Sequence, residues 1–179
     1  MLEPKKLLNG RRVVLRGLVD ADRAQLLKWR NDPDLKRLTG PGPFVPVRTE
    51  DIQISDSEQS IQFGICLASS QQLVGVIALS NLSWTNRCAE LSIFIGETAN
   101  HGVSYGTDAI RMLLDYGFNE LNLHRIELEV VSYNARAIRA YRNLGFTLEG
   151  TKREFGERDG QRYDLQIYGL LADEHRTVR

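Results

Sequence analysis

A segment between residues 93 and 109 combines residue types that can bind an anion. It reads Ile-Phe-Ile-Gly-Glu-Thr-Ala-Asn-His-Gly-Val-Ser-Tyr-Gly-Thr-Asp-Ala. Gly102 and Gly106 allow the backbone to turn tightly and to approach a ligand closely. The segment runs directly into a predicted helix, whose first turn offers unpaired N–H donors and a partial positive charge. These features predict a loop that binds phosphate groups.

Spacing excludes two common phosphate-binding loops. No Gly-Lys-Ser or Gly-Lys-Thr follows the glycines, as the loop of a nucleotide hydrolase requires. The Gly-x-Gly-x-x-Gly spacing of dinucleotide-binding loops is absent as well. The sequence therefore predicts a phosphate-binding turn of another kind.

Apolar periodicity predicts the elements that position this loop. A strand over residues 88–95 precedes it, and apolar residues at three- and four-residue steps over 110–121 predict a helix after it. A strand over 126–131 then leads to a second helix, which begins at Asn134 and is stopped by Gly145. Further strands are predicted over residues 12–16, 61–67, 73–82, 146–150 and 164–171.

Two other regions are predicted to be helix and loop. A helix through Leu26, Leu27 and Trp29 is predicted to end before Asn31-Asp-Pro33. Residues 39–60 hold three prolines and predict a loop-rich stretch, and Lys152–Asp164 predicts a charged turn. The order of strands and helices indicates an α/β fold with a mixed sheet.

Composition narrows the class of protein. The 179 residues fit one domain, and 23 basic residues balance 23 acidic ones, so neither nucleic acid nor an anionic membrane is indicated as a partner. No apolar run has the length of a signal peptide or a membrane span. Cys66 and Cys88 lack metal-ligand spacing. We therefore expect a cytoplasmic protein without a metal site.

The loop and a second motif together resemble the GNAT superfamily of N-acetyltransferases. The acetyl-CoA loop of that family has the pattern Gln/Arg-x-x-Gly-x-Gly/Ala, and His101, Ser104 and Gly106 occupy its three key positions. The first two depart from the family pattern, although histidine can still donate to a phosphate and serine keeps its N–H. The second motif extends over residues 129–146 and contains Asn134, Tyr141 and Gly145-Phe146.

Further stretches resemble one branch of that superfamily. Val14-Leu-Arg16, Trp29-Arg-Asn-Asp-Pro33 and Leu121-Asn-Leu-His-Arg125 are similar to the branch that contains the ribosomal-protein N-terminal (alanine or serine) acetyltransferases. The resemblance implies one GNAT domain over residues 1–179 with a core of about 11–174. It also implies a mixed, mostly antiparallel central sheet with a splayed parallel strand pair and helices on both faces.

The resemblance implies how acetyl-CoA, the co-substrate, is bound. Backbone N–H groups of Ile93, Phe94 and Ile95 are expected to pair with the pantetheine arm and to meet the carbonyl oxygen as it gains charge. Asn134 and Arg139 are expected to contact the coenzyme from the second helix, where Asn134 can also act as the N-cap. The expected pyrophosphate contacts come from His101, Gly102, Val103, Ser104, Tyr105, Gly106 and Thr107.

Transfer to an amine also needs an acid for the departing thiolate and a base for the ammonium. Tyr141 matches the family tyrosine at the coenzyme sulfur and is the expected acid; the alternative is a packing role, since Ile138, Tyr141 and Leu144 form an apolar stripe. Glu129 matches the catalytic glutamate of one group of N-terminal acetyltransferases. Glu90, on the strand before the loop, is the rival base, and ordered water is the third possibility.

We predict direct acetyl transfer through a ternary complex, because proximity removes the need for a covalent nucleophile. The acceptor is a primary amine, either a protein N-terminus or a small amine, and residues 39–60 and Lys152–Asp164 are expected on the acceptor side. A homodimer is compatible with the sequence. The departures at His101 and Ser104 leave one alternative of another class, a catalytically weak or inactive CoA-binding regulatory module.

Overall fold

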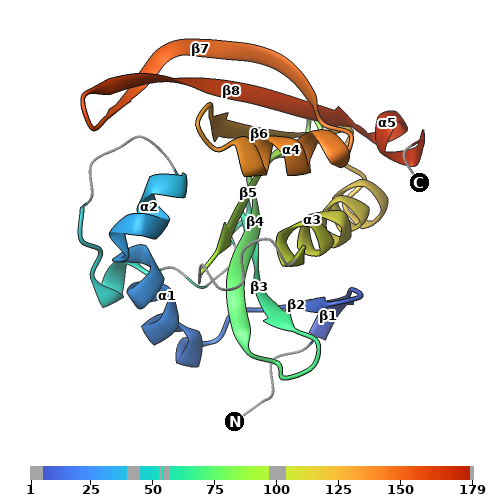
Figure 1. Ribbon diagram of the computed structural model, residues 1–179. Helices are drawn as coiled ribbons and strands as arrows, with labels where there is room; N and C mark the ends of the chain where they lie inside the picture. Colours follow the sequence, from blue (N-terminus) through green and yellow to red (C-terminus); the bar gives the residue numbers. More distant parts are fainter. Residues whose placement is uncertain (1–5, 40–44, 53, 55–56, 97–103, 178–179) are drawn as a thin grey trace.

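The computed structural model describes residues 6–39, 45–52, 54, 57–96 and 104–177 of the 179-residue chain (Figure 1). The strands are β1 (Lys6–Asn9), β2 (Val13–Arg16), β3 (Ile61–Leu67), β4 (Leu73–Ser83), β5 (Cys88–Ile95), β6 (Arg125–Val131), β7 (Thr147–Arg158) and β8 (Gln161–Leu171). The helices are α1 (Arg23–Arg30), α2 (Pro33–Thr39), α3 (Tyr105–Asp115), α4 (Ala135–Asn143) and α5 (Ala172–Thr177). Short 3-10 turns lie at Asp20–Asp22 and Thr49–Asp51, and a π-helical turn over Tyr116–Glu120 continues α3.

The described strands form one eight-stranded sheet in the order β1-β2-β3-β4-β5-β6-β8-β7. Every neighbouring pair in this sheet is antiparallel except β5 and β6, which are parallel. The segment that contains α3 is the crossover connection between these two strands, since parallel neighbours need a long connecting segment. The expected mixed, mostly antiparallel sheet is confirmed.

The parallel pair separates part-way along its length. Its ladder ends at Glu90 and Glu127, although both strands continue beyond these residues. The N–H of Gly96, just after β5, donates to the carbonyl of Val74 in β4 at 2.8 Å. Alternation along the strand then directs the N–H groups of Leu91 and Ile93 toward β6. Beyond Glu90, no described strand pairs with this side of β5.

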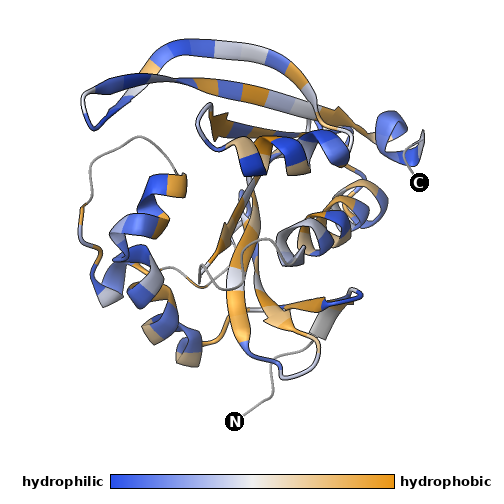
Figure 2. Ribbon diagram, in the orientation of Figure 1, coloured by the Kyte–Doolittle hydropathy of each residue, from blue (hydrophilic) through white to orange (hydrophobic). Residues whose placement is uncertain are grey.

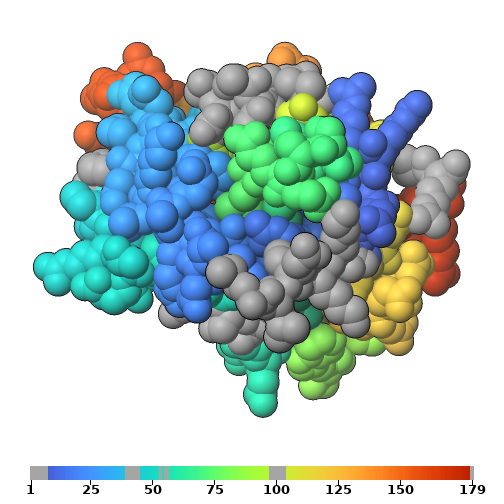
Figure 3. Space-filling model, turned by 90° about the horizontal axis from the view of Figure 1, so that it is seen from below, coloured from blue at the N-terminus to red at the C-terminus, as the bar shows by residue number. Residues whose placement is uncertain are grey.

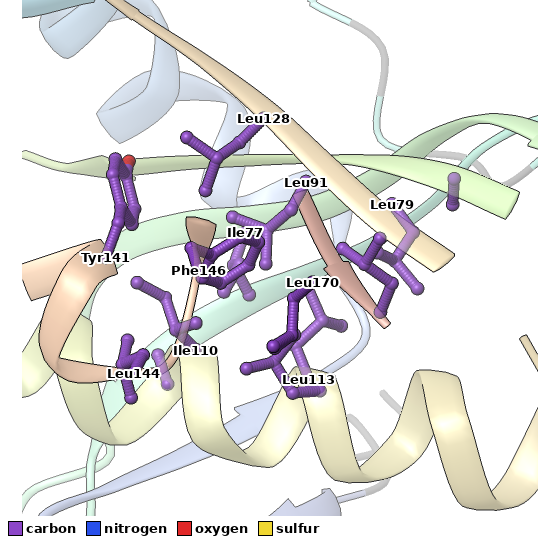
Figure 4. Packing of buried hydrophobic residues seen from close by; sticks show 14 of the residues in the cluster. Ile77, Leu79, Leu91, Ile110, Leu113, Leu128, Tyr141, Leu144, Phe146 and Leu170 are labelled. Carbon is purple, nitrogen blue, oxygen red and sulfur yellow. The ribbon is translucent and has the colours of Figure 1, made fainter. Parts of the chain in front are cut away.

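Helices cover both faces of the sheet, as expected, with α3 and α4 on one face and α1 and α2 on the other (Figure 1). The larger apolar cluster lies between the sheet and α3 and α4, and includes Leu113, Ile138 and Leu170 (Figure 4). The smaller cluster lies under α1 and α2, and Leu73 at the start of β4 packs against it. Figure 3 shows α1 and the start of β4 together on the underside of the molecule. Apolar residues are concentrated in the central strands in Figure 2, where the outer strand β7 is largely polar.

Trp29 joins α1 to the splayed end of β5. Its ring is 2% exposed and lies edge-on to Phe94, with 5.8 Å between the ring centroids. A Cβ at Gly96 would lie 1.9 Å from the Trp29 ring, so only glycine permits this approach. The packing fixes α1 against the strand end that leads into the predicted phosphate loop.

The Asn31-Asp-Pro33 sequence ends one helix and begins another. The expected end of α1 is confirmed at Arg30, but α2 follows at once and was not predicted. The Asp32 carboxylate accepts the backbone N–H groups of Asp34 and Leu35 at 2.9 and 3.2 Å. Asp32 therefore acts as an N-cap and Pro33 as the first helical residue, a position that proline favours.

The prediction of a charged turn over Lys152–Asp164 is wrong. These residues belong to a long hairpin of β7 and β8, and the turn itself is Asp159-Gly160, with φ of 50° and 74°. Asp-Gly with two positive φ values is the usual two-residue hairpin turn. The sequence does not predict this part of β7, because this edge strand exposes most of its side chains on both faces and so lacks alternating apolar residues.

No helix in the described part of the chain is long and apolar enough to cross a bilayer.

Candidate active site

The start of α3 lies where the sequence predicts the phosphate loop. His101, Gly102 and Val103 lie outside the described residues, so the structure describes the predicted loop from Ser104 onward. Ser104 is the residue before α3 and has φ 67° and ψ 11°, a left-handed conformation. Glycine adopts this conformation without strain, whereas serine does so at a cost. The backbone thus keeps at Ser104 the geometry that the family pattern assigns to glycine.

Gly106, in the first turn of α3, lies against the end of β5. A Cβ at this position would lie 3.6 Å from Ile93 Cδ1 and 3.8 Å from Ile95 Cγ1, which are ordinary contacts. Glycine costs a helix up to about 1 kcal/mol relative to alanine. The fold alone therefore gives no reason for glycine here, whereas a ligand that touches the backbone does. The first turn of α3 thus contacts the splayed end of β5, where no described strand pairs with the side of β5 that faces β6.

The other predicted residues of this region line the same area. Tyr105 is half-buried and packs against the main core, and Thr107 is half-buried. Ser104 and Thr107 border a depression of about 240 Å³ whose other lining residues are Arg11, Arg12, Asp108 and Arg111. Asp108 accepts the backbone N–H of Arg12 at 2.8 Å and so ties α3 to the β1–β2 turn. The sequence analysis did not identify this arginine-rich border, because Arg11 and Arg111 meet only in the fold.

The three residues predicted on β5 divide between the two faces of the sheet. Ile93 and Ile95 pack against the core under α3, and Phe94 packs against Trp29 under α1. These side chains fix the strand, while the Ile93 N–H points into the gap between β5 and β6. A backbone donor in such a gap can hydrogen-bond an amide or a thioester carbonyl.

Tyr141 lies on the inner face of α4. Its side chain is 8% exposed and meets Phe146 edge-on, with 6.0 Å between ring centroids. The ring stands beside Leu128 of β6 with its hydroxyl at the outer end of the cluster (Figure 4). Burial raises the pKa of Tyr141 from its ordinary value to about 12. The hydroxyl has no hydrogen-bond partner among the described residues, so packing accounts for the ring but not for the oxygen.

Asn134 and Arg139 differ in how much the fold uses them. The Asn134 side chain accepts the N–H of Ala137 at 3.2 Å as the N-cap of α4, and donates to the carbonyl of Leu38 at the end of α2 at 3.2 Å. Asn134 thus holds the start of α4 against α2. Arg139 is exposed on α4. The structure brings Asn134, but not Arg139, into a network with its neighbours.

The two candidate bases lie on the face of the sheet that α1 and α2 cover. Glu90 is half-buried and stands at the last ladder pair of β5 and β6, opposite Glu127. Its carboxylate accepts the side-chain amide of Asn81 at 2.7 Å. Asn81 lies in a bulge of β4 with φ 52°, a conformation that asparagine tolerates. The hydrogen-bond partner of Glu90 is therefore neutral.

Glu129 lies on β6, two residues beyond Glu127 and on the same face of the sheet as Glu90. Its strand is interior to the sheet, between β5 and β8, but its carboxylate is not free of a partner. Lys152 of β7 donates to Glu129 Oε1 at 2.6 Å, and the Glu129 side chain is 38% exposed. The two candidate bases thus differ in charge environment, since Glu129 is neutralised by an ammonium and Glu90 is not.

A second ion cluster occupies the start of β6. Arg125 pairs with Glu127 at 2.8 Å and with both oxygens of Glu149. Its hydrogen bonds to Glu149 raise the pKa of Arg125, and the same bonds lower the pKa of Glu149. Sequence alternation placed Glu127 on the face of Glu129, but nothing in the sequence pairs Arg125 with a residue 24 positions away. Within the described ranges, no group of His, Cys, Asp and Glu side chains could hold a metal ion.

This geometry can now be compared with known proteins. The family model of the acetyltransferase (GNAT) domain matches residues 12–147, a range that contains the splayed strands, α3 and α4. The chain belongs to this family. The resemblance seen in the sequence is therefore confirmed, and with it the class of enzyme, an acetyl-CoA-dependent N-acetyltransferase.

Two curated relatives of this acetyltransferase illustrate the range of similarity. The uncharacterized N-acetyltransferase p20 of Bacillus licheniformis is 28% identical over 175 residues, which cover 94% of this chain and 97% of p20. YdaF of Bacillus subtilis (strain 168), provisionally named a ribosomal N-acetyltransferase, is 34% identical over 57% of this chain and 55% of YdaF. YdaF agrees with the branch that the sequence resembles.

A solved structure supports the fold of this acetyltransferase. The spermidine N-acetyltransferase from Vibrio cholerae, in complex with CoA and spermine, superposes with a TM-score of 0.82 at 24% identity. The similarity covers 92% of this chain and 98% of that chain. The expected fold class is thereby confirmed over nearly the whole described chain.

Proposed function

We propose that this chain transfers an acetyl group from acetyl-CoA directly to a primary amine, with both substrates bound at the gap between β5 and β6. The observation that carries the proposal is the exposed, left-handed start of α3 at Ser104, whose first turn contacts the part of β5 beyond its ladder with β6. Coenzyme and amine then approach from opposite faces of the sheet, the coenzyme beside α3 and α4 and the amine beside α1 and α2. Holding both reactants in one gap supplies the proximity on which direct transfer depends.

Acetyl-CoA fits the residues present on the first face. Its pyrophosphate would lie over the backbone of the first turn of α3, where Ser104 is exposed and Gly106 has no side chain to cover the main chain. The pantetheine arm would run along β5, and the Ile93 N–H is suited to stabilise the carbonyl oxygen as it gains charge. The CoA in the Vibrio cholerae structure supports the same choice of coenzyme.

Glu90 is our first choice for the base, ahead of Glu129. A base must offer a lone pair to the proton of the attacking amine, and it binds the ammonium form first. Glu90 meets this need because its partner is the neutral amide of Asn81. Glu129 already holds the ammonium of Lys152, which would repel a second cation. Glu90 also lies at the last ladder pair of the two strands, where the gap begins.

Tyr141 is suited to stabilise the departing thiolate by a hydrogen bond. Its pKa of about 12 keeps the hydroxyl protonated at neutral pH. A thiol has a pKa of roughly 8.5, so complete proton transfer from Tyr141 to the thiolate is uphill by about 5 kcal/mol. Tyr141 would therefore share its proton with the thiolate, and solvent would complete the protonation.

The experiment that tests the proposal is thiol release from acetyl-CoA over a panel of primary amines, including short peptides with a free N-terminus and small alkyl amines. We expect turnover with at least one class. Glu90→Gln should lose activity near neutral pH by at least tenfold and recover partly at high pH, where the amine arrives deprotonated. Glu129→Gln, a shape-conserving control on the same face, should lose less.

Three outcomes would contradict parts of this proposal. Calorimetric binding of acetyl-CoA without turnover on any amine would indicate a coenzyme-binding module in place of an enzyme. A larger loss in Glu129→Gln than in Glu90→Gln would assign the base to Glu129. Equal activity of both variants and the wild type at every pH would leave solvent as the base.

A further inference from the structure

Lys152 occupies an unusual place on the acceptor face. It lies on β7, opposite Leu165 of β8, and its side chain reaches across β8 to Glu129 of β6. The ammonium donates to Glu129 at 2.6 Å and also stands 5.4 Å from the centre of the Phe155 ring. Carboxylates and aromatic faces both attract ammonium ions in proteins.

We propose that Lys152 fills, with its own ammonium, the cation site formed by Glu129 and Phe155, and thereby restricts the acceptor to amines with a single positive charge. The inference deepens the proposed function, on which it rests, by naming the class of acceptor. The reacting amine takes Glu90, which among the described residues is a carboxylate at the gap with a neutral partner. A second ammonium on the same molecule would need Glu129, which Lys152 already holds.

The spacing of the carboxylates supports this exclusion. Glu127 and Glu129 are two residues apart on one strand, which places them about 6.6 Å apart along β6. A diamine with a four-carbon spacer could therefore place one nitrogen beside Glu90 and Glu127 and the other beside Glu129. Lys152 prevents this arrangement by occupying the carboxylate and by its charge.

Other described carboxylates that share this face, on β6, on β7 and at the hairpin tip, are already paired. Glu127 and Glu149 are both paired with Arg125. Toward the tip of the hairpin, Arg37 pairs with Asp159 at 2.7 Å, and Arg158 lies beside them. Each carboxylate of this set therefore faces an arginine, and Glu90 remains as the carboxylate with a neutral partner.

The test compares butylamine with butane-1,4-diamine, two acceptors that differ in the second ammonium. Thiol release at saturating acetyl-CoA gives kcat/KM for each in the wild type and in Lys152→Gln. We expect the wild type to prefer the monoamine by about tenfold, and Lys152→Gln to raise kcat/KM for the diamine by about fivefold to tenfold. The monoamine value should stay within about twofold, because Lys152 does not touch the reacting amine.

Arg162→Gln is the matched control. Arg162 lies on the same hairpin and pairs with Glu157 at 3.0 Å, with an exposure of 58% against 47% for Lys152. The Arg162→Gln substitution removes the same charge from a comparable surface pair, so the ratio of the kcat/KM values for the two amines should not change. Such half-exposed pairs contribute little to stability, so both variants are expected to fold.

Two results would overturn the inference: equal or better use of the diamine by the wild type, or an unchanged ratio in Lys152→Gln. A binding measurement keeps this test separate from the proposed function. If no amine is acetylated, the proposed function fails, but thermal shifts of the CoA-bound protein still compare the two amines. A diamine-specific shift that appears only in Lys152→Gln would support the inference, and equal shifts in both proteins would contradict it.

Discussion

Among single residues, Ser104 has a backbone conformation that its side chain does not favour. Its φ of 67° costs a non-glycine residue roughly 1–2 kcal/mol, whereas glycine adds roughly 0.5–1 kcal/mol of backbone entropy. Ser104→Gly should therefore raise the free energy of unfolding in urea by about 0.5–1 kcal/mol. Ser92→Gly is the control, because Ser92 is an exposed strand residue without a positive φ, and it should lower the value. Equal losses in both variants would show that Ser104 is unstrained.

Tyr141 is the residue whose packing and chemical roles can be separated. Tyr141→Phe keeps the ring contact with Phe146 and removes only a hydroxyl that has no partner in the described part of the chain. We expect kcat to fall at least tenfold, while the Kd for acetyl-CoA stays within about twofold. Wild-type turnover in the variant would assign Tyr141 to packing alone.

The pKa of Tyr141 also predicts a pH dependence of stability. Above pH 10 the unfolded tyrosine loses its proton, while the folded one keeps it until about pH 12. The unfolded state then binds fewer protons, so the folded state loses stability as the pH rises through this window. Between pH 9 and pH 11 the wild type should lose about 1 kcal/mol more than Tyr141→Phe. Parallel curves in urea unfolding would contradict burial of this hydroxyl.

Among the elements, α2 and the β7–β8 hairpin hold one another at the acceptor side. The hydroxyl of Tyr133 donates to the carbonyl of Arg37 at the end of α2, at 2.7 Å, and Arg158 donates to the same carbonyl. Tyr133→Phe should lower stability by about 1 kcal/mol and speed amide exchange in α2 and at the hairpin tip. In Tyr163→Phe, which removes a hydroxyl bonded only to Gln161 within the hairpin, exchange in α2 should not change. The same exchange in both variants would mean that Tyr133 does not hold α2.

The same two elements mark how far the sequence determines the fold. Strands β3 to β6 and helices α3 and α4 are predictable, because each buries one face and shows the period of its element. Helix α2 was not predicted because the Asp32-Pro33 pair is as typical of the start of a helix as of its end. The hairpin was hidden because an edge strand exposed on both faces has no apolar alternation, although Asp159-Gly160 marks its turn.

At the scale of the whole molecule, the candidate site exists only through packing between distant segments. Its parts come from β5, α3, α4 and β7, and the resemblance of motifs placed Tyr141, Glu90 and Glu129 in their elements. The side chains that contact these residues could not be predicted in this way. The pairing of Glu129 with Lys152 joins residues 23 positions apart, and the contact of Trp29 with Phe94 joins α1 to β5. Such pairs depend on register and twist, which local patterns do not contain.

The central claim is that acetyl-CoA lies against the first turn of α3 in the gap between β5 and β6. Calorimetric titration of acetyl-CoA into the wild type, Gly106→Val and Gly17→Val tests it most directly. A Cβ at Gly106 makes ordinary contacts and one at Gly17 meets nothing within 4 Å, so both variants are expected to fold, and a thermal melt of each checks this. The account predicts wild-type affinity for Gly17→Val and at least a tenfold loss, about 1.4 kcal/mol, for Gly106→Val. A folded Gly106→Val protein that binds acetyl-CoA as tightly as the wild type would contradict it.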